Sequence, residues 1–303
     1  MKTLLIVSIV PLISSFVSAQ PEPQIVERGQ NYRRWERTVT ETLGDGRTVE
    51  RKSGYTELGT SMHYWKDNQW MTSRAQFRLF PGGAIAEEGA FQLIIAPDVS
   101  QEPVVDLLTP DSTRFQISPR WLAYHDLNGQ SAMVAAVKPC VGQLLEPNVI
   151  VFPDAFDDIR AALRFTSQPW GVEQEVLLLE SGPMRPEDYG LQDRGGNVVL
   201  EMWSEFHTWP EGGLATASIE SGLPDVKLVF GVAQIGIGKA FSLGDEENSI
   251  PVGKTWTRVD GQRQFLIEAV RQTDLAPLLA KLPQQAQAGF RANRTGDQRL
   301  KMI

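Results

Sequence analysis

Two carboxylates on one predicted strand are the candidate acid–base residues of this chain. Glu201 and Glu205 lie in the strand predicted over residues 198–206, and glycoside hydrolysis uses a pair of carboxylates. Residues four apart on a strand are separated by roughly 13 Å, whereas the carboxyl groups of glycosidases lie at most about 9.5 Å apart. Glu201 and Glu205 are therefore too far apart to be the two catalytic carboxylates of a glycosidase, although either could act with a residue distant in sequence.

Three histidines offer candidate metal ligands or general bases. His63, His125 and His207 each lie in or beside a predicted strand with an aromatic neighbour, and none shows the H-E-x-x-H spacing of a zinc site. The stretch from Gly59 to His63, G-T-S-M-H, lacks the second glycine of a nucleophile elbow. The sequence therefore predicts surface or packed histidines and no metal or cofactor, and it leaves any catalytic residue unknown.

Two other segments approach ligand-binding motifs without matching them. The acidic run of Asp154, Asp157 and Asp158 is rich in oxygen ligands for calcium, but its spacing differs from the EF-hand loop, so a solvated turn is favoured. The stretch A-Q-I-G-I-G-K-A over residues 233–240 lacks the first glycine and the hydroxyl of a phosphate loop. We predict a strand and a turn there.

The most informative feature of the composition is the number of tryptophans, of which the chain has eight. Trp65 and Trp70 flank one predicted turn, Trp203 and Trp209 bracket a histidine, and Trp170 occupies a tight Pro-Trp-Gly turn. Buried tryptophans fill cores and exposed ones stack on ligands such as sugars, and we expect most of the eight in the core. Trp170 is the ligand-binding candidate, and the alternative is that its ring folds back to cap the core.

Cys140 is the only cysteine, so the chain has no intramolecular disulfide. Its position between apolar segments predicts a buried, inert thiol. A Cys–His nucleophile is the alternative, although no histidine is close to Cys140 in the sequence.

The N-terminus predicts export. Lys2 precedes an apolar run over residues 4–13, and Val17-Ser18-Ala19 supplies the small residues that signal peptidase reads. We predict a signal peptide over residues 1–19, a mature chain from Gln20 and a secreted or periplasmic location. The apolar run is interrupted and too short to span a membrane, so no membrane span is expected after signal removal.

The charge balance limits the partners. The chain has 29 Lys and Arg against 37 Asp and Glu, a net charge of −8. Nucleic acid and anionic membrane surfaces need clustered basic residues, so we predict neither as a partner. An extracellular glycan or a cell-surface protein is expected instead.

The elements that must position these residues are predicted to be antiparallel strands. Alternating segments are separated by turn residues at 44–46, 66–69, 81–83, 110–112, 127–130, 169–171 and 260–261. One helix is predicted over residues 274–282, with Asp274 as its N-cap and Pro283 ending it. We predict an all-β globular region over residues 20–283, an antiparallel β-sandwich or two stacked sandwiches, with a possible boundary at residues 182–196 and a loose tail over residues 284–303.

Residues 149–180, V-I-V-F-P-D-A-F-D-D-I-R-A-A-L-R-F-T-S-Q-P-W-G-V-E-Q-E-V-L-L-L-E, resemble a segment of uncharacterised exported bacterial proteins, and more loosely a segment upstream of RHS/YD repeats in large cell-surface proteins. The stretches over residues 55–65, 107–111 and 252–270 resemble further blocks of that group. The resemblance implies an exported β-rich module and assigns no active-site residue. Our leading prediction is a non-enzymatic module that binds or organises something at the cell exterior. The alternative is a carbohydrate-active enzyme whose acid and base are dispersed over strands.

Overall fold

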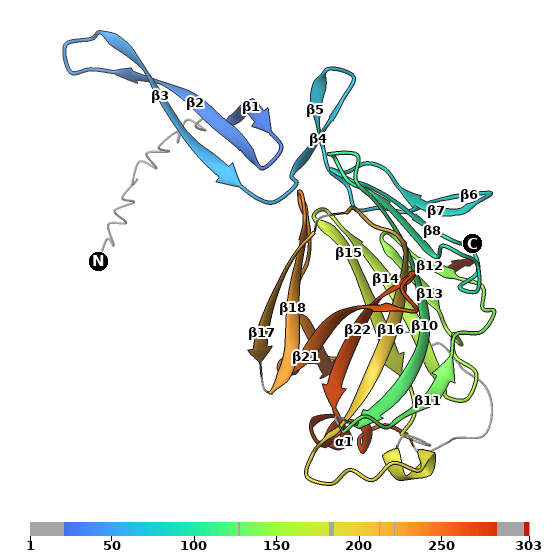
Figure 1. Ribbon diagram of the computed structural model, residues 1–303. Coiled ribbons are helices and arrows are strands. Elements are labelled where there is room, and N and C mark those ends of the chain that lie inside the picture. The colour runs from blue at the N-terminus through green and yellow to red at the C-terminus, as the bar shows by residue number, and fades with distance from the viewer. Residues whose placement is uncertain are drawn as a thin grey trace, which may run out of the picture.

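The computed structural model describes residues 21–126, 128–181, 185–211, 213–220, 222–283 and 300–302. The predicted signal peptide and its cleavage site at residues 19–20 lie outside the described residues. The fold is all-β and sandwich-like with one α-helix, as the alternating segments predict (Figure 1). No helix within the described ranges is long and apolar enough to cross a membrane.

One sheet of 13 strands forms the larger layer. Its order is β17-β18-β21-β22-β16-β10-β9-β8-β7-β6, with β11 beside β10, β19 beside β18 and β20 beside β21. The strands are β6 (Arg78–Phe80), β7 (Gly83–Ala86), β8 (Gln92–Ile95), β9 (Val105–Leu108), β10 (Arg114–Asp126), β11 (Ser131–Ala136), β16 (Val198–Thr208), β17 (Leu214–Glu220), β18 (Leu223–Phe230), β19 (Ala233–Ile235), β20 (Gly238–Ser242), β21 (Asp245–Val259) and β22 (Arg263–Arg271).

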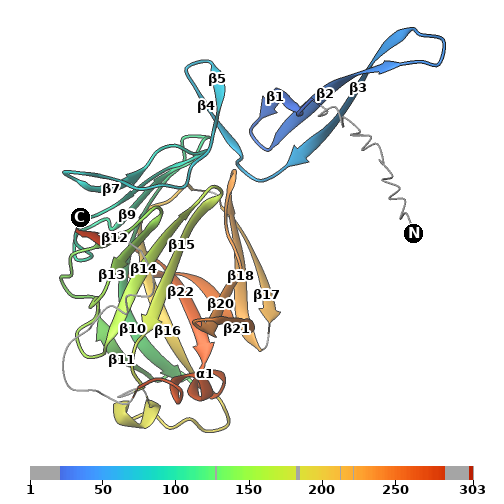
Figure 2. The ribbon, with the colours of Figure 1, turned by 180° about the vertical axis from the view of Figure 1, so that it is seen from behind.

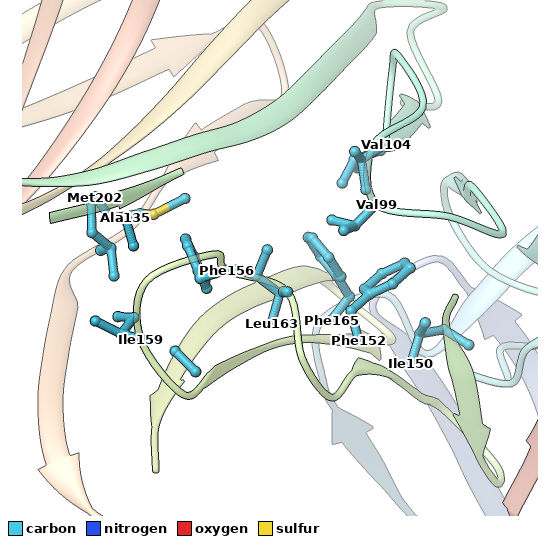
Figure 3. Packing of buried hydrophobic residues seen from close by; sticks show 14 of the residues in the cluster. Val99, Val104, Ala135, Ile150, Phe152, Phe156, Ile159, Leu163, Phe165 and Met202 are labelled. Atoms are coloured by element: carbon cyan, nitrogen blue, oxygen red, sulfur yellow. The ribbon is translucent and has the colours of Figure 1, made fainter. Parts of the chain in front are cut away.

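A five-stranded sheet forms the second layer, in the order β15-β14-β13-β12-β23. Its strands are β12 (Gln143–Leu145), β13 (Val149–Phe152), β14 (Ala161–Gln168), β15 (Gly171–Leu178) and β23 (Leu300–Met302). In Figure 2 this sheet lies in front of β10, β16 and β22. The main core lies between the layers, where Phe152 and Phe165 pack edge to face and Met202 approaches Phe156 (Figure 3).

Three N-terminal strands stand apart from both layers. β1 (Gln24–Gly29), β2 (Tyr32–Thr42) and β3 (Thr48–Leu58) form a separate sheet that projects from the body, and we call residues 24–58 the arm (Figures 1 and 2). A second separate hairpin, β4 (His63–Lys66) and β5 (Gln69–Thr72), follows it. The sequence predicts the hairpins that turn at residues 44–46 and 66–69, but neither β1 nor the separation of these strands from the sandwich.

Turn chemistry explains why the hairpins form where they were predicted. Asp67 and Asn68 connect β4 to β5 with φ angles of 49° and 60°, and Asp260 and Gly261 connect β21 to β22 with φ angles of 53° and 68°. Two successive residues with positive φ give the twist that antiparallel strands need, and Asp, Asn and Gly tolerate it. These tight turns fix the strand register, and with it the face that each side chain occupies.

Two boundaries differ from the prediction. The helix α1 is Gln272–Leu279, two residues earlier than predicted, and its N-cap is Arg271 rather than Asp274, which lies in the first turn. Residues 114–117 and 121–125, which the alternation predicts as two strands, belong to the single strand β10, because a register shift between Pro119 and Trp121 lets the ladder continue past the proline.

The possible boundary at residues 182–196 falls between β15 of the second layer and β16 of the larger one, and the structure describes it from residue 185 onward. Residues 185–196 contain a short 3₁₀ helix, Pro186–Tyr189, and lead from β15 to β16. Residues before and after this segment, such as Phe165 and Met202, belong to the same hydrophobic cluster. Most of the predicted tail lies outside the described residues. Leu300–Met302 is strand β23 beside β12, so the prediction of a loose tail is wrong for these three residues, which complete the edge of the second sheet.

Candidate functional site

Strands β10, β16 and β22 carry one set of side chains into the core and the other set to the outside. Leu122 and Met202 are buried in the main core, whereas the cross-strand pair Trp121 and Trp203 lies on the opposite face of the same sheet. Because side chains alternate along a strand, Glu201 and Glu205 share this outer face with Trp203. The outer face is therefore an aromatic and charged surface backed by the sandwich.

The aromatic part of the outer face is a packed cluster. The rings of Trp121 and Trp203 stack with centroids 5.5 Å apart at an interplanar angle of 27°. Phe265 lies 5.5 Å from Trp121 and 5.4 Å from Trp203, and it is almost fully buried. The Arg263 guanidinium covers the ring of Phe265 at 5.0 Å. The two tryptophans, both half-buried, thus form a rigid platform over Phe265.

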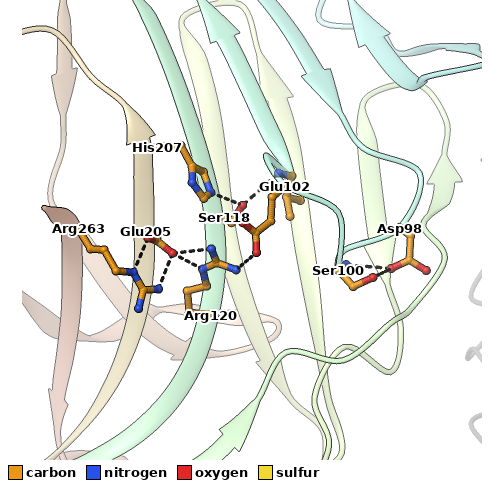
Figure 4. Close-up of polar contacts among 9 residues, drawn as sticks. Asp98, Ser100, Glu102, Ser118, Arg120, Glu205, His207 and Arg263 are labelled. Atoms are coloured by element: carbon orange, nitrogen blue, oxygen red, sulfur yellow. Dashed lines mark hydrogen bonds and ion pairs between the residues drawn. The ribbon is translucent and has the colours of Figure 1, made fainter. Parts of the chain in front are cut away.

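Arg263, which covers Phe265, belongs to a network of four charged side chains. Figure 4 shows the network. Arg263 donates from Nε and Nη2 to the two oxygens of Glu205, each at 2.7 Å, and Arg120 Nε donates to Glu205 Oε2 at 2.6 Å. Arg120 also pairs with Glu102 through Nη1. The hydrogen bonds from Arg263 and Arg120 lower the pKa of Glu205 to about 2, so this carboxylate is ionised and fully engaged.

Two further side chains complete the polar border. His207 Nε2 and Ser118 Oγ share a hydrogen bond of 2.9 Å, and burial lowers the pKa of His207. Glu201 Oε2 accepts a hydrogen bond of 2.8 Å from Trp203 Nε1, and burial raises the pKa of this carboxyl group. Glu201 therefore also fixes the orientation of the Trp203 indole.

Opposite pKa shifts on two carboxylates can indicate an acid and a base. The spacing argues against that role, because Glu201 and Glu205 are four residues apart on one continuous strand, roughly 13 Å, with Trp203 between them. Both oxygens of Glu205 are also occupied by guanidinium groups. The arrangement suits hydrogen bonding to a ligand that lies flat on the sheet better than proton transfer.

The hollows described on the surface lie elsewhere. One of about 180 Å³ lies against the arm beside Tyr55, and one of about 10 Å³ lies beside Pro169. Both are smaller than the roughly 300–1,000 Å³ of small-molecule pockets. A flat aromatic face therefore remains the best candidate site.

No family model, curated protein or solved structure matches the chain significantly. The resemblance to exported bacterial proteins therefore stays a prediction from the sequence, and the site is argued from its own geometry.

The structure places Trp170 away from the outer face. It lies in the turn between β14 and β15 of the five-stranded sheet, and it is 55% exposed. Of the two alternatives left open by the sequence, an exposed ring and a ring folded back onto the core, this exposure favours the first. The structure does not bring Trp170 together with Trp121 and Trp203, so it is a separate ligand-binding candidate.

Replacing Trp170 by Ala is expected to leave the melting temperature almost unchanged. A fully buried ring would cost roughly 3–5 kcal/mol on truncation, but more than half of this side chain is already in water. Thermal unfolding of the variant, with acrylamide quenching of wild-type fluorescence, measures this. A large loss of stability would show that the indole is a structural cap and remove it from the binding candidates.

The expectation that most tryptophans fill the core is wrong. All eight lie in the described part of the chain, and none is fully buried: six are half-buried, and Trp65 and Trp170 are exposed. Two of the half-buried ones, Trp209 and Trp256, pack against the edge of a second buried cluster that contains Phe206 and Phe230. An indole on an outward-facing strand position keeps one side in contact with solvent even when its other side is covered.

The remaining candidates from the sequence are His63, the acidic run and Cys140, and the structure shows what each of them contacts. His63 is buried with Nδ1 2.8 Å from the Gly29 carbonyl oxygen. Lys138 pairs with Asp154 at 2.8 Å, and no group of three metal-ligating side chains occurs among the described residues. Cys140 is half-buried rather than buried because it lies in a surface connection, although burial still raises the pKa of its thiol. A raised pKa favours the less reactive protonated form.

Sequence reasoning missed the basic half of the site. Glu201, Trp203, Glu205 and His207 occupy every second position of the strand. Because side chains alternate between the two faces of a strand, all four lie on one face. That signal was available. Arg120 is 85 residues from Glu205, and nothing in a single sequence indicates that pairing.

Proposed function

We propose that this chain is an exported β-sandwich protein that binds a glycan at the cell exterior, and that the outer face around Trp121 and Trp203 is the contact surface. The observation that carries the proposal is the stacked, half-buried tryptophan pair on the outer face of the sheet, next to charged hydrogen-bonding groups. Export is the prediction of the N-terminal sequence.

The chemistry of a sugar ring fits this surface. Its C–H face is apolar enough to lie against an aromatic ring, and its hydroxyl groups both donate and accept hydrogen bonds. Arg120, Arg263 and Glu102 surround the platform with donors and an acceptor whose positions are fixed by their ion pairs. A preorganised surface loses little conformational entropy on binding, which favours affinity.

A cell-surface protein is the second ligand class, and hydrolysis is the second activity. The charges of Glu102, Arg120, Glu205 and Arg263 sum to zero, so the surface lacks the single-sign field that steers a charged protein partner. Hydrolysis would need a free carboxylate base near Glu201, and Glu205 is held by two guanidiniums. Binding without cleavage is therefore the proposed activity.

Replacing Trp203 by Ala is expected to weaken glycan binding at least tenfold, about 1.4 kcal/mol. A glycan array with the wild-type chain identifies the ligand, and calorimetric titration then compares the variants. Glu201→Gln keeps the side-chain volume and an acceptor for the indole, so it should retain most of the affinity. Urea unfolding of each variant verifies that the fold is intact.

Trp170→Ala is the matched control, because it removes an indole from the other sheet. It should leave affinity unchanged if the outer face is the binding surface. Loss of binding in Trp170→Ala alone would transfer the site to the β14–β15 turn. Release of reducing sugar by the wild type would replace the binding proposal with the hydrolytic one.

A further inference from the structure

The arm presents a long open strand edge. β2 and β3 pair over 11 residues each, from Tyr32 opposite Leu58 to Thr42 opposite Thr48, without a register shift. β1 covers the other side of β2 only up to Glu36, and the outer edge of β3 has no strand partner among the described residues. Such an edge carries unpaired N–H and C=O groups and is a template for another strand.

No layer of the body covers the arm. Ten of the 11 residues of β3 are exposed, including Tyr55 and Val49. Beyond Glu36 the arm is a bare two-stranded hairpin, and isolated hairpins are marginally stable in water. A third strand along β3 would stabilise this region.

The charges of the arm are largely neutralised within it. Arg33 pairs with Glu57 at 2.6 Å and Arg51 with Glu41 at 2.9 Å. Residues 24–58 contain seven basic and six acidic side chains in mixed order. A polyanion would find few free cations here, whereas a protein strand of mixed charge fits.

We propose that the occupant is a second copy of this chain, with the two β3 edges pairing antiparallel about a twofold axis at Ser53. A twofold axis through a residue keeps the same face of both arms on one side, so the Trp35–Tyr55 stacks of the two copies share a face. Ser53 is the central residue of β3, so an axis at this position pairs all 11 residues of the strand with residues of the same strand in the second copy.

The side chains of β3 favour this register. Axes at Glu50, Arg51 or Lys52 would each place a charge opposite its own copy, which destabilises a pair. The axis at Ser53 places Arg51 opposite the aromatic Tyr55 of the second copy, and Lys52 opposite Gly54, where no side chain obstructs it. No like charges face each other along the strand.

The other edge of the arm is a poorer template. β1 is six residues long and has a register shift between Ile25 and Glu27. Bulges and short lengths are the features that protect sheet edges from pairing. The continuous edge of β3 lacks both.

A cysteine at the proposed axis tests the register directly. In a Cys140→Ser background, Ser53→Cys should give a disulfide-linked dimer under mild oxidation, because the two Ser53 Cα atoms would lie within about 4.4–6.8 Å. Val49→Cys is the matched control on the same strand. In this register its two copies lie eight residues apart along the strand direction, roughly 26 Å, and should not cross-link. Light scattering of the wild type over a dilution series should show twice the mass of one chain.

The outcomes are distinct. Cross-linking of Ser53→Cys but not Val49→Cys, with a dimeric mass, supports the proposal. A monomeric wild type, or a dimer that cross-links equally or better through Val49→Cys, overturns it. A dimer that neither variant cross-links shows that the interface lies elsewhere and also overturns it.

Discussion

Replacing Glu205 by Ala is expected to lower the free energy of unfolding by about 3 kcal/mol. The Glu205 side chain is 9% exposed, and its carboxylate accepts hydrogen bonds from both Arg120 and Arg263, so truncation leaves two guanidiniums without their shared partner. The value lies at the low end of the range for buried pairs because Arg263 is partly exposed and Arg120 retains Glu102. Urea denaturation at neutral pH measures the loss.

The pH dependence of Glu205→Gln separates charge from packing. The folded-state pKa of Glu205 is about 2, below the ordinary 4.5, so its contribution to stability is present above about pH 4.5 and is lost as the pH falls towards 2. The stability difference between wild type and Glu205→Gln should therefore shrink over that window.

Glu201→Gln is the control on the same face of the same strand. Burial raises the pKa of Glu201, so its ionised form is disfavoured in the folded state and removing the charge should cost no stability at neutral pH. An equal loss in Glu201→Gln and Glu205→Gln would contradict the assignment of these roles.

The hairpins were predictable because their turns are local. Asp67-Asn68 and Asp260-Gly261 can adopt positive φ whatever surrounds them, so the residue types alone locate the turns. The helix boundary was less predictable. The chain turns into the helix directly after β22. The N-cap residue Arg271 makes no capping hydrogen bond to the helix, because its guanidinium donates to the carbonyl oxygens of Gly196 and Gly222, and no residue-type signal identifies such a start.

The separation of the arm and the charged half of the site depend on contacts between segments that are distant in the sequence, and such contacts cannot be predicted from a single sequence. Residues 32–42 and 47–51 are predicted as ordinary strands, and only the charged residues on both faces of these strands indicate that they cover no core. Arg263 and Glu205 are 58 residues apart and meet because β16 and β22 are neighbours in the sheet. Strand order, rather than strand identity, was the missing information.

Replacing Lys254 by Met is expected to cost about 3–5 kcal/mol, the typical loss when one member of a buried ion pair is removed. The Lys254 side chain is 1% exposed and forms a short ion pair with Asp225, and Glu268 lies directly opposite it on β22. Burial raises the pKa of Glu268 while Lys254 lowers it, so both carboxyl groups lose a stabilising ammonium in the variant.

The double variant Lys254→Met/Asp225→Asn shows what the ion pair contributes. β18 and β21 pair in parallel with Asp225 opposite Lys254, so this ion pair lies at the junction of the two strands. Neutral, well-packed replacements of both partners often restore stability. The double variant should therefore be more stable than Lys254→Met, as measured by urea denaturation of both singles and the double. Additive losses in the double variant would mean that the two side chains act independently, and that the junction of β18 and β21 depends on packing rather than on this ion pair.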